Sequence, residues 1–470
     1  MNHFKAGAAG ASIMPSPQIV ANTWHPQMAV RFDEVGSPLQ VKVLALTYGD
    51  HCNVLLVNLD TINIPQSSAD NLRQAIADTL KIQIQDVFIF CTHSHSTPCI
   101  EDLGREHLYF DFVKAKTCEA VEQAWAIRQP ARFGHGCTHV VGASFNQRVP
   151  LSDGGVKFTR DYREGLASGR PVDPRLSVVR IDDESGKPIA GWVRFAAHPA
   201  CVIFDAPISA EYPGYMTQQL SETVAGGAPV LFGFGAAGDV NCVPMFGTES
   251  DSARLGKNLA EQAAPVFESI QTQQPQRMVS GDHTLQLPLD DPPSLQTLDH
   301  ELAEAKAFVR ALDEDPDLVW VLGTNCWKDW SVEKKKAYVV PHIAWIERMK
   351  LALEQGCTFP GTWPVPLSAW VLDDLGLLFY GGEPFTEIGL AVAARSPLNE
   401  TLVVAHCNGW TGYLGTDEDR RRGGYETVLW HRSFFDEPGM RRPLTYALGA
   451  ADVMVDQSLA LIDRLDKQSR

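Results

Sequence analysis

A short apolar run that ends in two histidines is the stretch that most constrains this chain. Residues 87–91 read Val-Phe-Ile-Phe-Cys, which has the length and composition of a buried strand, and helical spacing of the apolar residues before it predicts an α/β unit. His93 and His95 follow, and residues i and i+2 of an extended chain point to the same side. We therefore expect the two imidazoles together at the carboxyl end of a core strand, where α/β sheets place their sites.

This histidine pair suits either a metal site or acid–base chemistry, because imidazole is the commonest metal ligand and titrates near neutral pH. The alternative is a pair of histidines that only make hydrogen bonds in a strand-end loop. The pair alone does not decide between these two interpretations.

Two more predicted strands end in residues of this kind. Residues 176–181 and 190–197 predict a hairpin that ends in His198, and residues 375–380 predict a strand that runs into Glu383 at a turn before a helix. Separate strands can bring their ends to one point, so the three strand ends favour a shared metal. Taken alone, His198 also fits a capped strand end, and Glu383 fits a cap at the positive end of a helix.

Other polar residues compete less well for such a site. His135, Cys137 and His139 alternate on one face of a predicted strand, but they lie inside the strand and no neighbouring turn or carboxylate completes a ligand set. Asp60 follows a predicted hairpin at residues 41–59, where a turn cap explains it better than a contact with the histidines.

A polar loop and a glycine motif complete the candidates. Segment 149–173 predicts a loop, and Arg148 or Arg160 could contact a substrate there.

Residues 233–238 match the G-x-G-x-x-G pattern of dinucleotide-binding turns. That turn must open directly into a helix, whereas residues 239–244 predict a loop. We therefore expect no nicotinamide cofactor, and instead a close backbone approach at these glycines.

The charge and composition of the chain narrow the class of partner. The net charge of −17 over 470 residues disfavours nucleic acid and anionic membrane surfaces, which leaves a small molecule as the expected partner. No apolar run is long enough for a membrane span, and residues 1–5 begin no export signal, so we expect a cytoplasmic protein without stable membrane association. Ten cysteines without a C-x-x-C pair predict reduced thiols. The oligomeric state stays open, a homo-oligomer included.

The order of predicted elements indicates an α/β fold with a mixed β-sheet core and flanking helices. Apolar residues from Leu295 to Leu312 recur at helical spacing, and a second helix is predicted at residues 337–355. We interpret residues 292–356 as a helical insertion that covers a cleft, within one domain that spans residues 1–470. The insertion carries four tryptophans: Trp320, Trp327, Trp330 and Trp345.

Five short motifs are spread over most of the chain. They are Thr92-His93-Ser94-His95-Ser96, Phe195-Ala196-Ala197-His198-Pro199, Ala237-Gly238-Asp239-Val240, Gly382-Glu383-Pro384-Phe385, and Asn408-Gly409 through Gly424-Tyr425-Glu426. Together, and in this order, they resemble the neutral (non-lysosomal) ceramidase family, whose members are zinc-dependent enzymes that hydrolyse the amide of N-acyl sphingosines.

The resemblance implies a ceramidase-like catalytic domain with a zinc ion held by His93, His198, Glu383 and Tyr425. Two neutral imidazoles and hard oxygen donors leave room for a water molecule whose pKa zinc lowers. The tyrosine enters this set through the resemblance only. The resemblance also places His95 beside the scissile bond, where it would donate a proton to the leaving group.

The chain also departs from the family pattern. Members commonly carry serine after Gly-Asp-Val, where this chain has Asn241, a side chain that can donate a hydrogen bond to an oxyanion but cannot be a nucleophile. Members usually carry an export signal and a carboxyl-terminal immunoglobulin-like domain, and we expect neither here. From these departures we expect the family's catalytic machinery with a substrate other than ceramide.

From these features we expect a zinc-dependent amidohydrolase that acts on a small soluble amide through metal-activated water. Two alternatives stay open. One is hydrolysis of another bond on the same metal site, such as an ester, a lactone or a glycoside. The other is a binding protein that kept the fold and lost the chemistry.

Overall fold

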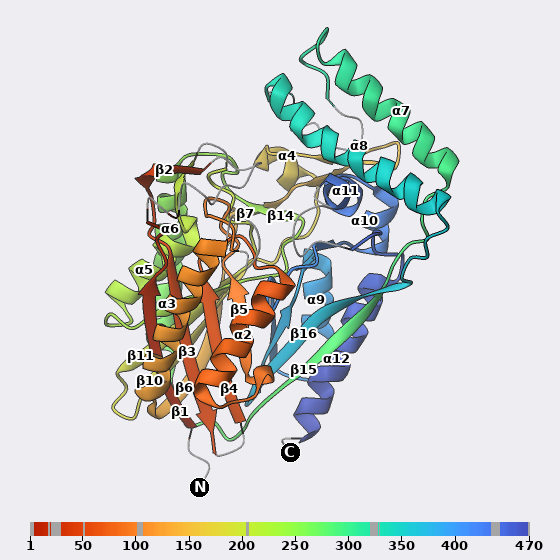
Figure 1. Cartoon of the computed structure of the whole chain (residues 1–470). Helices are drawn as coiled ribbons and strands as arrows, with labels where there is room; N and C mark the ends of the chain where they lie inside the picture. The colour runs from red at the N-terminus through yellow and green to blue at the C-terminus, as the bar shows by residue number, and fades with distance from the viewer. Residues whose placement is uncertain are drawn as a thin grey trace.

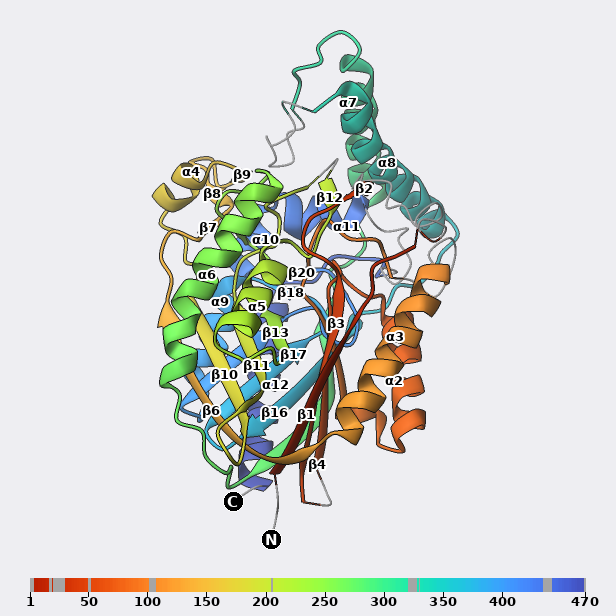
Figure 2. The same ribbon diagram turned by 90° about the vertical axis from the view of Figure 1, so that its left-hand side faces the viewer.

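Two β-sheets pack against each other, and helices cover their outer faces (Figure 1, Figure 2). This arrangement confirms the predicted α/β class with mixed sheets and flanking helices. Trp320 and Trp327 lie outside the described residues. The computed structural model describes residues 4–16, 19, 30–49, 52–100, 107–203, 206–319, 328, 330–433 and 442–468.

The larger sheet has eight strands among the described residues, in the order β13-β11-β10-β6-β1-β3-β4-β5. The pairs β4–β5 and β11–β13 are parallel, and the other pairs are antiparallel. Its strands are β1 (Phe4–Ser12), β3 (Gln40–Tyr48), β4 (Cys52–Leu59), β5 (Val87–Cys91), β6 (Gln129–His139), β10 (Arg175–Asp183), β11 (Pro188–Phe195) and β13 (Val230–Phe234).

The second sheet has four strands in the described part of the chain, in the order β15-β16-β17-β19, of which β17 and β19 are parallel. Its outer face is covered by two helices. These elements are β15 (Met278–Pro288), β16 (Thr362–Leu372), β17 (Leu375–Tyr380), β19 (Glu400–Val404), α9 (Thr386–Arg395) and α12 (Ala450–Gln468).

Alternating residues of a strand face different layers, because side chains point in turn to its two sides. In β5, Phe88 and Phe90 belong to the core between the sheets, where their rings lie 5.2 and 5.8 Å from that of Phe379 in β17. Val87 and Ile89 face the outer helical layer. The helices of that layer are α2 (Gln66–Leu80), α3 (His107–Ala126), α5 (Glu211–Thr223) and α6 (Glu249–Ser269).

Three strand–helix–strand units run through the two sheets. They are β4-α2-β5 and β11-α5-β13 in the larger sheet, and β17-α9-β19 in the second sheet. In each unit the two strands are hydrogen-bonded neighbours and run parallel, so their carboxyl ends lie at the same edge. In α/β sheets, this edge is where binding sites form.

The predicted helical insertion is present as α7 (Leu295–Ala311) and α8 (Val332–Glu354), which project beyond the sheets at the top of Figure 1. Both helices begin at a serine N-cap, Ser294 and Ser331, whose hydroxyl accepts a hydrogen bond from a backbone N–H of the first turn. Trp345 packs in the core of the second sheet, whereas Trp330 is only partly buried.

The structure differs from the sequence predictions in four places. The predicted loop at 149–173 contains regular structure, and the predicted loop after Asp239 begins as a strand. Residues 402–407 form an apolar run that predicts one strand, but the strand ends at Val404. The amino-terminal strand was not predicted. The elements concerned are β8 (Arg148–Pro150), β9 (Val156–Phe158), α4 (Tyr162–Ala167), β19, β14 (Val240–Cys242) and β1.

The remaining elements are short: β2 (Val30–Val35), a 3₁₀ turn (Ile84–Asp86), β7 (Ser144–Asn146), β12 (Ala206–Ile208), β18 (Glu383–Pro384), β20 (Tyr413–Leu414), α10 (Asp417–Arg422), a π-helical turn (Tyr425–Leu429) and α11 (Trp430–Ser433). Within the described ranges, no helix combines the length and the apolar character that crossing a membrane requires.

Candidate metal centre

Five side chains meet where the three strand–helix–strand units end. His93 and His95 follow β5, His198 follows β11, Glu383 follows β17 and His406 follows β19. The Nε2 atoms of His198 and His93 lie 3.2 and 3.5 Å from Glu383 Oε2, and His406 Nε2 lies 3.3 Å from Glu383 Oε1. The His95 ring lies 4.7 Å from that of His93. We call these five residues the histidine cluster.

Backbone carbonyls orient three of the imidazoles. A carbonyl oxygen can only accept a hydrogen bond, so Nδ1 carries the proton and Nε2 keeps a free electron pair. Proteins orient metal-binding histidines in this way. The Nδ1-to-oxygen distances are 2.7 Å from His93 to Ile62, 3.0 Å from His95 to Pro199 and 3.0 Å from His198 to Val240.

Two members of the cluster have left-handed backbone conformations. The φ angle is 65° at His93 and 55° at His406. Such a conformation costs on the order of 1–3 kcal/mol for a residue other than glycine, and it clusters at functional sites. Backbone hydrogen bonds hold both residues in place: His93 N donates to the Thr61 carbonyl at 2.9 Å, and His406 N donates to the Gly382 carbonyl at 3.2 Å.

The pKa shifts within the cluster favour neutral imidazoles around an ionised carboxylate. Burial lowers the pKa of His93 to about 3, and the neighbouring His406 adds to this effect. Burial also lowers the pKa of His95 and that of His406. Burial alone would raise the pKa of Glu383, but His93 and His406 hold it well below its usual range. These are the protonation states that metal ligands need.

The cluster contains electron-pair donors without a protein partner. Among the described residues, neither His93 Nε2 nor either ring nitrogen of His406 makes a hydrogen bond, although all three atoms are buried. Two overlapping groups have ligand atoms within 4.8 Å of one another: His93 with His95 and His198, and His93 with Glu383 and His406. Since unpartnered buried polar atoms are unfavourable, this donor set fits a bound metal ion.

The turn that carries Glu383 packs tightly against the glycine motif at residues 233–238. A Cβ atom on Gly238 would lie 2.7 Å from the Glu383 carbonyl oxygen, so a side chain at this position would clash. On the other side, Trp410 Nε1 donates a hydrogen bond of 2.9 Å to Glu383 Oε1. Close backbone approach is therefore what these glycines provide, and β14, rather than a helix, follows them.

Tyr425, the predicted fourth ligand, lies in an aromatic group next to the cluster. Its ring is 6.1 Å from that of Tyr413, which is in turn 6.3 Å from the His198 ring. The Tyr425 hydroxyl accepts a hydrogen bond of 3.1 Å from Tyr338, so helix α8 of the insertion contacts this residue. Burial raises the pKa of Tyr425 well above its usual range. Its role as a ligand stays a prediction.

Asn241 lies in β14 beside His198, and its amide orientation follows from its neighbours. Asn241 Nδ2 donates to Gln147 Oε1, and Gln147 Nε2 donates to Glu426 Oε1 at 2.5 Å. Because a carboxylate oxygen only accepts, Glu426 fixes the Gln147 amide, which in turn fixes that of Asn241. Asn241 Oδ1 has no partner among the described residues, so the side chain presents an acceptor and not the donor that an oxyanion requires.

His406 is the member of the cluster that the sequence prediction missed. The apolar run through Cys407 looks like one continuous strand, which would bury His406 in its interior. Because β19 ends at Val404, His406 instead follows a strand end, as His93 and His198 do. The position of His406 near the end of an apolar run was thus the sequence signal that could have predicted its place in the cluster.

Two polar residues near the sheet edge have structural roles. Asp60 Oδ2 accepts a hydrogen bond of 2.9 Å from the backbone N–H of Gln40, so its carboxylate ties the end of β4 to the neighbouring strand β3 and does not cap a local turn. Arg148 was a candidate for substrate contact, but that prediction is wrong. Its guanidinium is buried and forms ion pairs with Glu426 and with Asp419, so it is not available to a substrate.

The histidines of strand β6 stand apart from the cluster. His135 Nδ1 lies 2.9 Å from a Glu400 carboxylate oxygen, and His135 Nε2 lies 3.3 Å from one of Asp374. These carboxylates come from distant parts of the sequence, so the local sequence around His135 does not reveal them. Neither Cys137 nor His139 joins His135 in a group that could hold a metal among the described residues.

The fold and the cluster together define a two-sheet α/β protein with a histidine–carboxylate centre at the carboxyl ends of its parallel strands.

No family model matches the chain, and no curated protein matches it. Solved structures do. A neutral ceramidase from Pseudomonas aeruginosa has a TM-score of 0.66 and 16% identity, with 99% of this chain and 75% of that chain covered. A ceramidase complexed with C2 has a TM-score of 0.65 and 15% identity, with 99% of this chain and 76% of that chain covered. The chain therefore has the neutral ceramidase-like fold that its motifs predicted.

Proposed function

We propose that this protein is a zinc-dependent hydrolase that cleaves an amide bond in a small soluble substrate. The observation that carries the proposal is the convergence of His93, His198 and Glu383. A backbone carbonyl holds each imidazole Nδ1, and each Nε2 lies near the carboxylate. The fold supports amide hydrolysis as the reaction, because the similar solved structures are ceramidases.

His93 Nε2, His198 Nε2 and Glu383 Oε2 would hold the metal, with Tyr425 as the fourth ligand that the family resemblance implies. Zinc bound there would polarise the amide carbonyl and lower the pKa of a water molecule. Histidine and carboxylate ligands are usual in catalytic zinc sites. His406 faces the other carboxylate oxygen, Oε1, where it would help to orient Glu383.

His95 would move the proton during hydrolysis. It is half-buried, whereas His93 and His198 are buried, so it is the more accessible imidazole of the three. Since its Nδ1 proton points at the Pro199 carbonyl, Nε2 is a proton acceptor. We assign it two successive roles: it takes a proton from the attacking water and then delivers that proton to the leaving nitrogen, which extends the predicted role of proton donor.

Asn241 would orient the substrate. Its Oδ1 is the side-chain atom left without a partner among the described residues, and it can accept a hydrogen bond from a substrate N–H. An amide substrate supplies such a donor, whereas an ester or a lactone does not. This residue therefore favours amide hydrolysis over hydrolysis of an ester or a lactone.

Metal analysis tests the proposal. The purified wild-type protein should contain stoichiometric zinc by inductively coupled plasma mass spectrometry, and His93→Ala and His198→Ala should lose it. His300→Ala is the matched control, because its side chain is 74% exposed on α7, and it should keep the metal. Full zinc occupancy in both cluster variants would refute the ligand assignment. Zinc binding without turnover of any amide, ester, lactone or glycoside would indicate a binding protein.

A further inference from the structure

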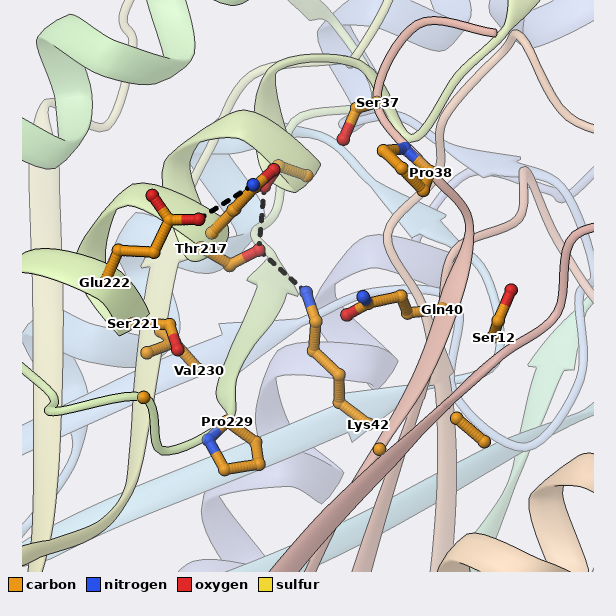
Figure 3. Close-up of a pocket in the computed structure, with 15 residues that line it drawn as sticks. Ser12, Ser37, Pro38, Gln40, Lys42, Thr217, Ser221, Glu222, Pro229 and Val230 are labelled. Atoms are coloured by element: carbon orange, nitrogen blue, oxygen red, sulfur yellow. Dashed lines mark hydrogen bonds between the residues drawn. The ribbon is translucent and has the colours of Figure 1, made fainter.

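A pocket of about 400 Å³ lies apart from the histidine cluster, and none of its lining residues belongs to the cluster (Figure 3). Strands β1 and β3 form one side, and helix α5 with the start of β13 forms the other. Its volume falls in the range of small-ligand sites.

A buried lysine lies at the base of this pocket. Lys42 of β3 is 8% exposed, and its side chain extends across the pocket toward α5 (Figure 3). There Lys42 Nζ donates a hydrogen bond of 2.7 Å to Thr217 Oγ1. Thr217 donates its own hydroxyl proton to the Pro213 carbonyl at 2.8 Å, so its oxygen accepts from the lysine. The lysine thus has a neutral partner at this end.

The ammonium group has hydrogen-bonding capacity that the described residues do not use. An ammonium carries three N–H donors, and Thr217 takes one of them. Among the described residues, no carboxylate oxygen lies within 4.0 Å of Lys42 Nζ. Asp60 attracts Lys42 at longer range, but its Oδ2 accepts a hydrogen bond from the Gln40 backbone instead. Burial of a charge without a directly paired counter-charge is unfavourable, so an anion in the pocket would be stabilising.

The pocket wall is tightly packed on one side and carries hydroxyl groups. Gly214 of α5 faces Ser37, and a Cβ atom on Gly214 would lie 2.2 Å from Ser37 Oγ. Ser37 is buried, and Ser221 is half-buried. Ser221 Oγ donates its proton to the Ala228 carbonyl at 2.8 Å, so its oxygen can accept a hydrogen bond from a ligand. Glu222 lies exposed at the rim. One ammonium beside one carboxylate favours a ligand with a single negative charge over a dianion such as a phosphate monoester.

We propose that this pocket binds a small hydroxy monocarboxylate, whose carboxylate pairs with the Lys42 ammonium and whose hydroxyl group donates to the hydroxyl oxygen of Ser37 or Ser221. The site is separate from the proposed zinc centre and goes beyond the proposed function. Burial also lowers the pKa of Lys42, which an anionic ligand would reverse.

Glycolate is the probe for this site, and ethylene glycol is its neutral counterpart. Saturation-transfer NMR on the intact protein should show saturable binding of glycolate and none of ethylene glycol. Lys42→Met should weaken glycolate binding about 10-fold or more, as expected for loss of a charged hydrogen-bond partner. Lys257→Met, which removes an exposed lysine of α6, should bind as the wild type does, and zinc content should be equal in all three proteins.

Two further measurements separate the pocket from the zinc centre and from misfolding. His93→Ala should keep glycolate binding, which makes failure of this proposal distinguishable from failure of the proposed function. In the wild-type protein, glycolate should protect Lys42 from acetylation, as measured by mass spectrometry of its peptides, and ethylene glycol should not. Equal binding by Lys42→Met and wild type, or acetylation of Lys42 that glycolate does not change, would overturn the proposal.

Discussion

Glu383 uses its two carboxylate oxygens for different neighbours. Oε2 lies near the Nε2 atoms of His93 and His198, whereas Oε1 accepts a hydrogen bond from Trp410 and faces His406. This division separates atoms that would contact a metal from atoms that would hold the carboxylate in position. The histidine cluster therefore supplies both a ligand set and the groups that orient it.

His406 provides a test of this division. If His406 orients Glu383, His406→Ala should lower zinc affinity by about 10- to 100-fold, as is typical when a group that orients a ligand is removed. Competition with a chelator measures the affinity. His406→Gln offers an amide N–H near Oε1 in place of the imidazole and should recover part of the loss. A loss in His406→Ala as complete as that in His93→Ala would instead assign His406 to the ligand set.

Tyr425 provides a second test at the same centre. A metal-bound phenolate contributes directly to affinity, so Tyr425→Phe should lower zinc affinity if the family resemblance holds. Tyr338→Phe is the control, because it removes the hydrogen bond that the Tyr425 hydroxyl accepts and leaves the Tyr425 phenol in place. If Tyr425→Phe retained zinc and lost turnover, the phenol would be a hydrogen-bond donor to the reacting carbonyl.

Much of the cluster could be predicted because strand ends are visible in the sequence. His93, His198 and Glu383 each follow an apolar run, and the structure brings all three together. His406 was missed because the sequence does not show that β19 ends at Val404. The partner that fixes Asn241 could not be predicted either, since Gln147 is far from it in the sequence and depends on Glu426.

At the scale of elements, strand β1 shows how small residues allow close packing. Residues 4–12 read Phe-Lys-Ala-Gly-Ala-Ala-Gly-Ala-Ser, which lacks the β-branched residues typical of strands. The strand nevertheless lies inside the larger sheet, between β6 and β3. Helix α3 crosses it closely, and a Cβ atom on Gly7 would lie 2.3 Å from the Ala124 carbonyl oxygen. Tertiary packing explains this composition, and for that reason the sequence alone did not predict the strand.

Gly7→Ala tests the close approach. The added methyl group would force β1 and α3 apart, so the free energy of unfolding should fall by about 1–3 kcal/mol, as overpacking usually costs. Urea denaturation followed by circular dichroism measures the change. Gly10→Ala, in the same strand, is the control, because its Cβ would lie 3.3 Å from the nearest atom, and it should cost less. Equal losses in the two variants would contradict the packing explanation.

At the scale of the whole molecule, the two sheets are linked by a polar contact as well as by their shared apolar core. His135 of β6 in the larger sheet contacts Asp374, in the turn between β16 and β17, and Glu400 of β19. The hydrogen bond to Glu400, followed by the charge of both carboxylates, raises the pKa of His135 even though burial opposes this. The protonated imidazole therefore stabilises the packing of one sheet on the other.

The sign of this effect predicts a pH dependence of stability. The pKa of an unfolded histidine is about 6.5, and the pKa of His135 is higher than this in the folded protein. Such a group contributes its full stabilisation at a pH below the unfolded pKa. The contribution disappears as the pH rises through the folded pKa. His135→Gln should therefore lower the free energy of unfolding at about pH 5.5 and change it little at about pH 8.5. Urea titrations of both proteins at the two pH values measure the difference. A loss that grows with pH would contradict the assignment.

The surface charge of the whole chain bears on the substrate. A net charge of −17 repels anionic membrane surfaces, which is unfavourable for extracting a lipid from a bilayer. We therefore expect kcat/KM to be higher for short, water-soluble amides than for long-chain N-acyl sphingosine under equal conditions. A panel of soluble amides assayed beside a long-chain ceramide in mixed micelles measures this preference, with His198→Ala as the control that assigns turnover to the histidine cluster. Efficient cleavage of the ceramide, with no turnover of any soluble amide, would contradict the prediction while leaving the zinc centre intact.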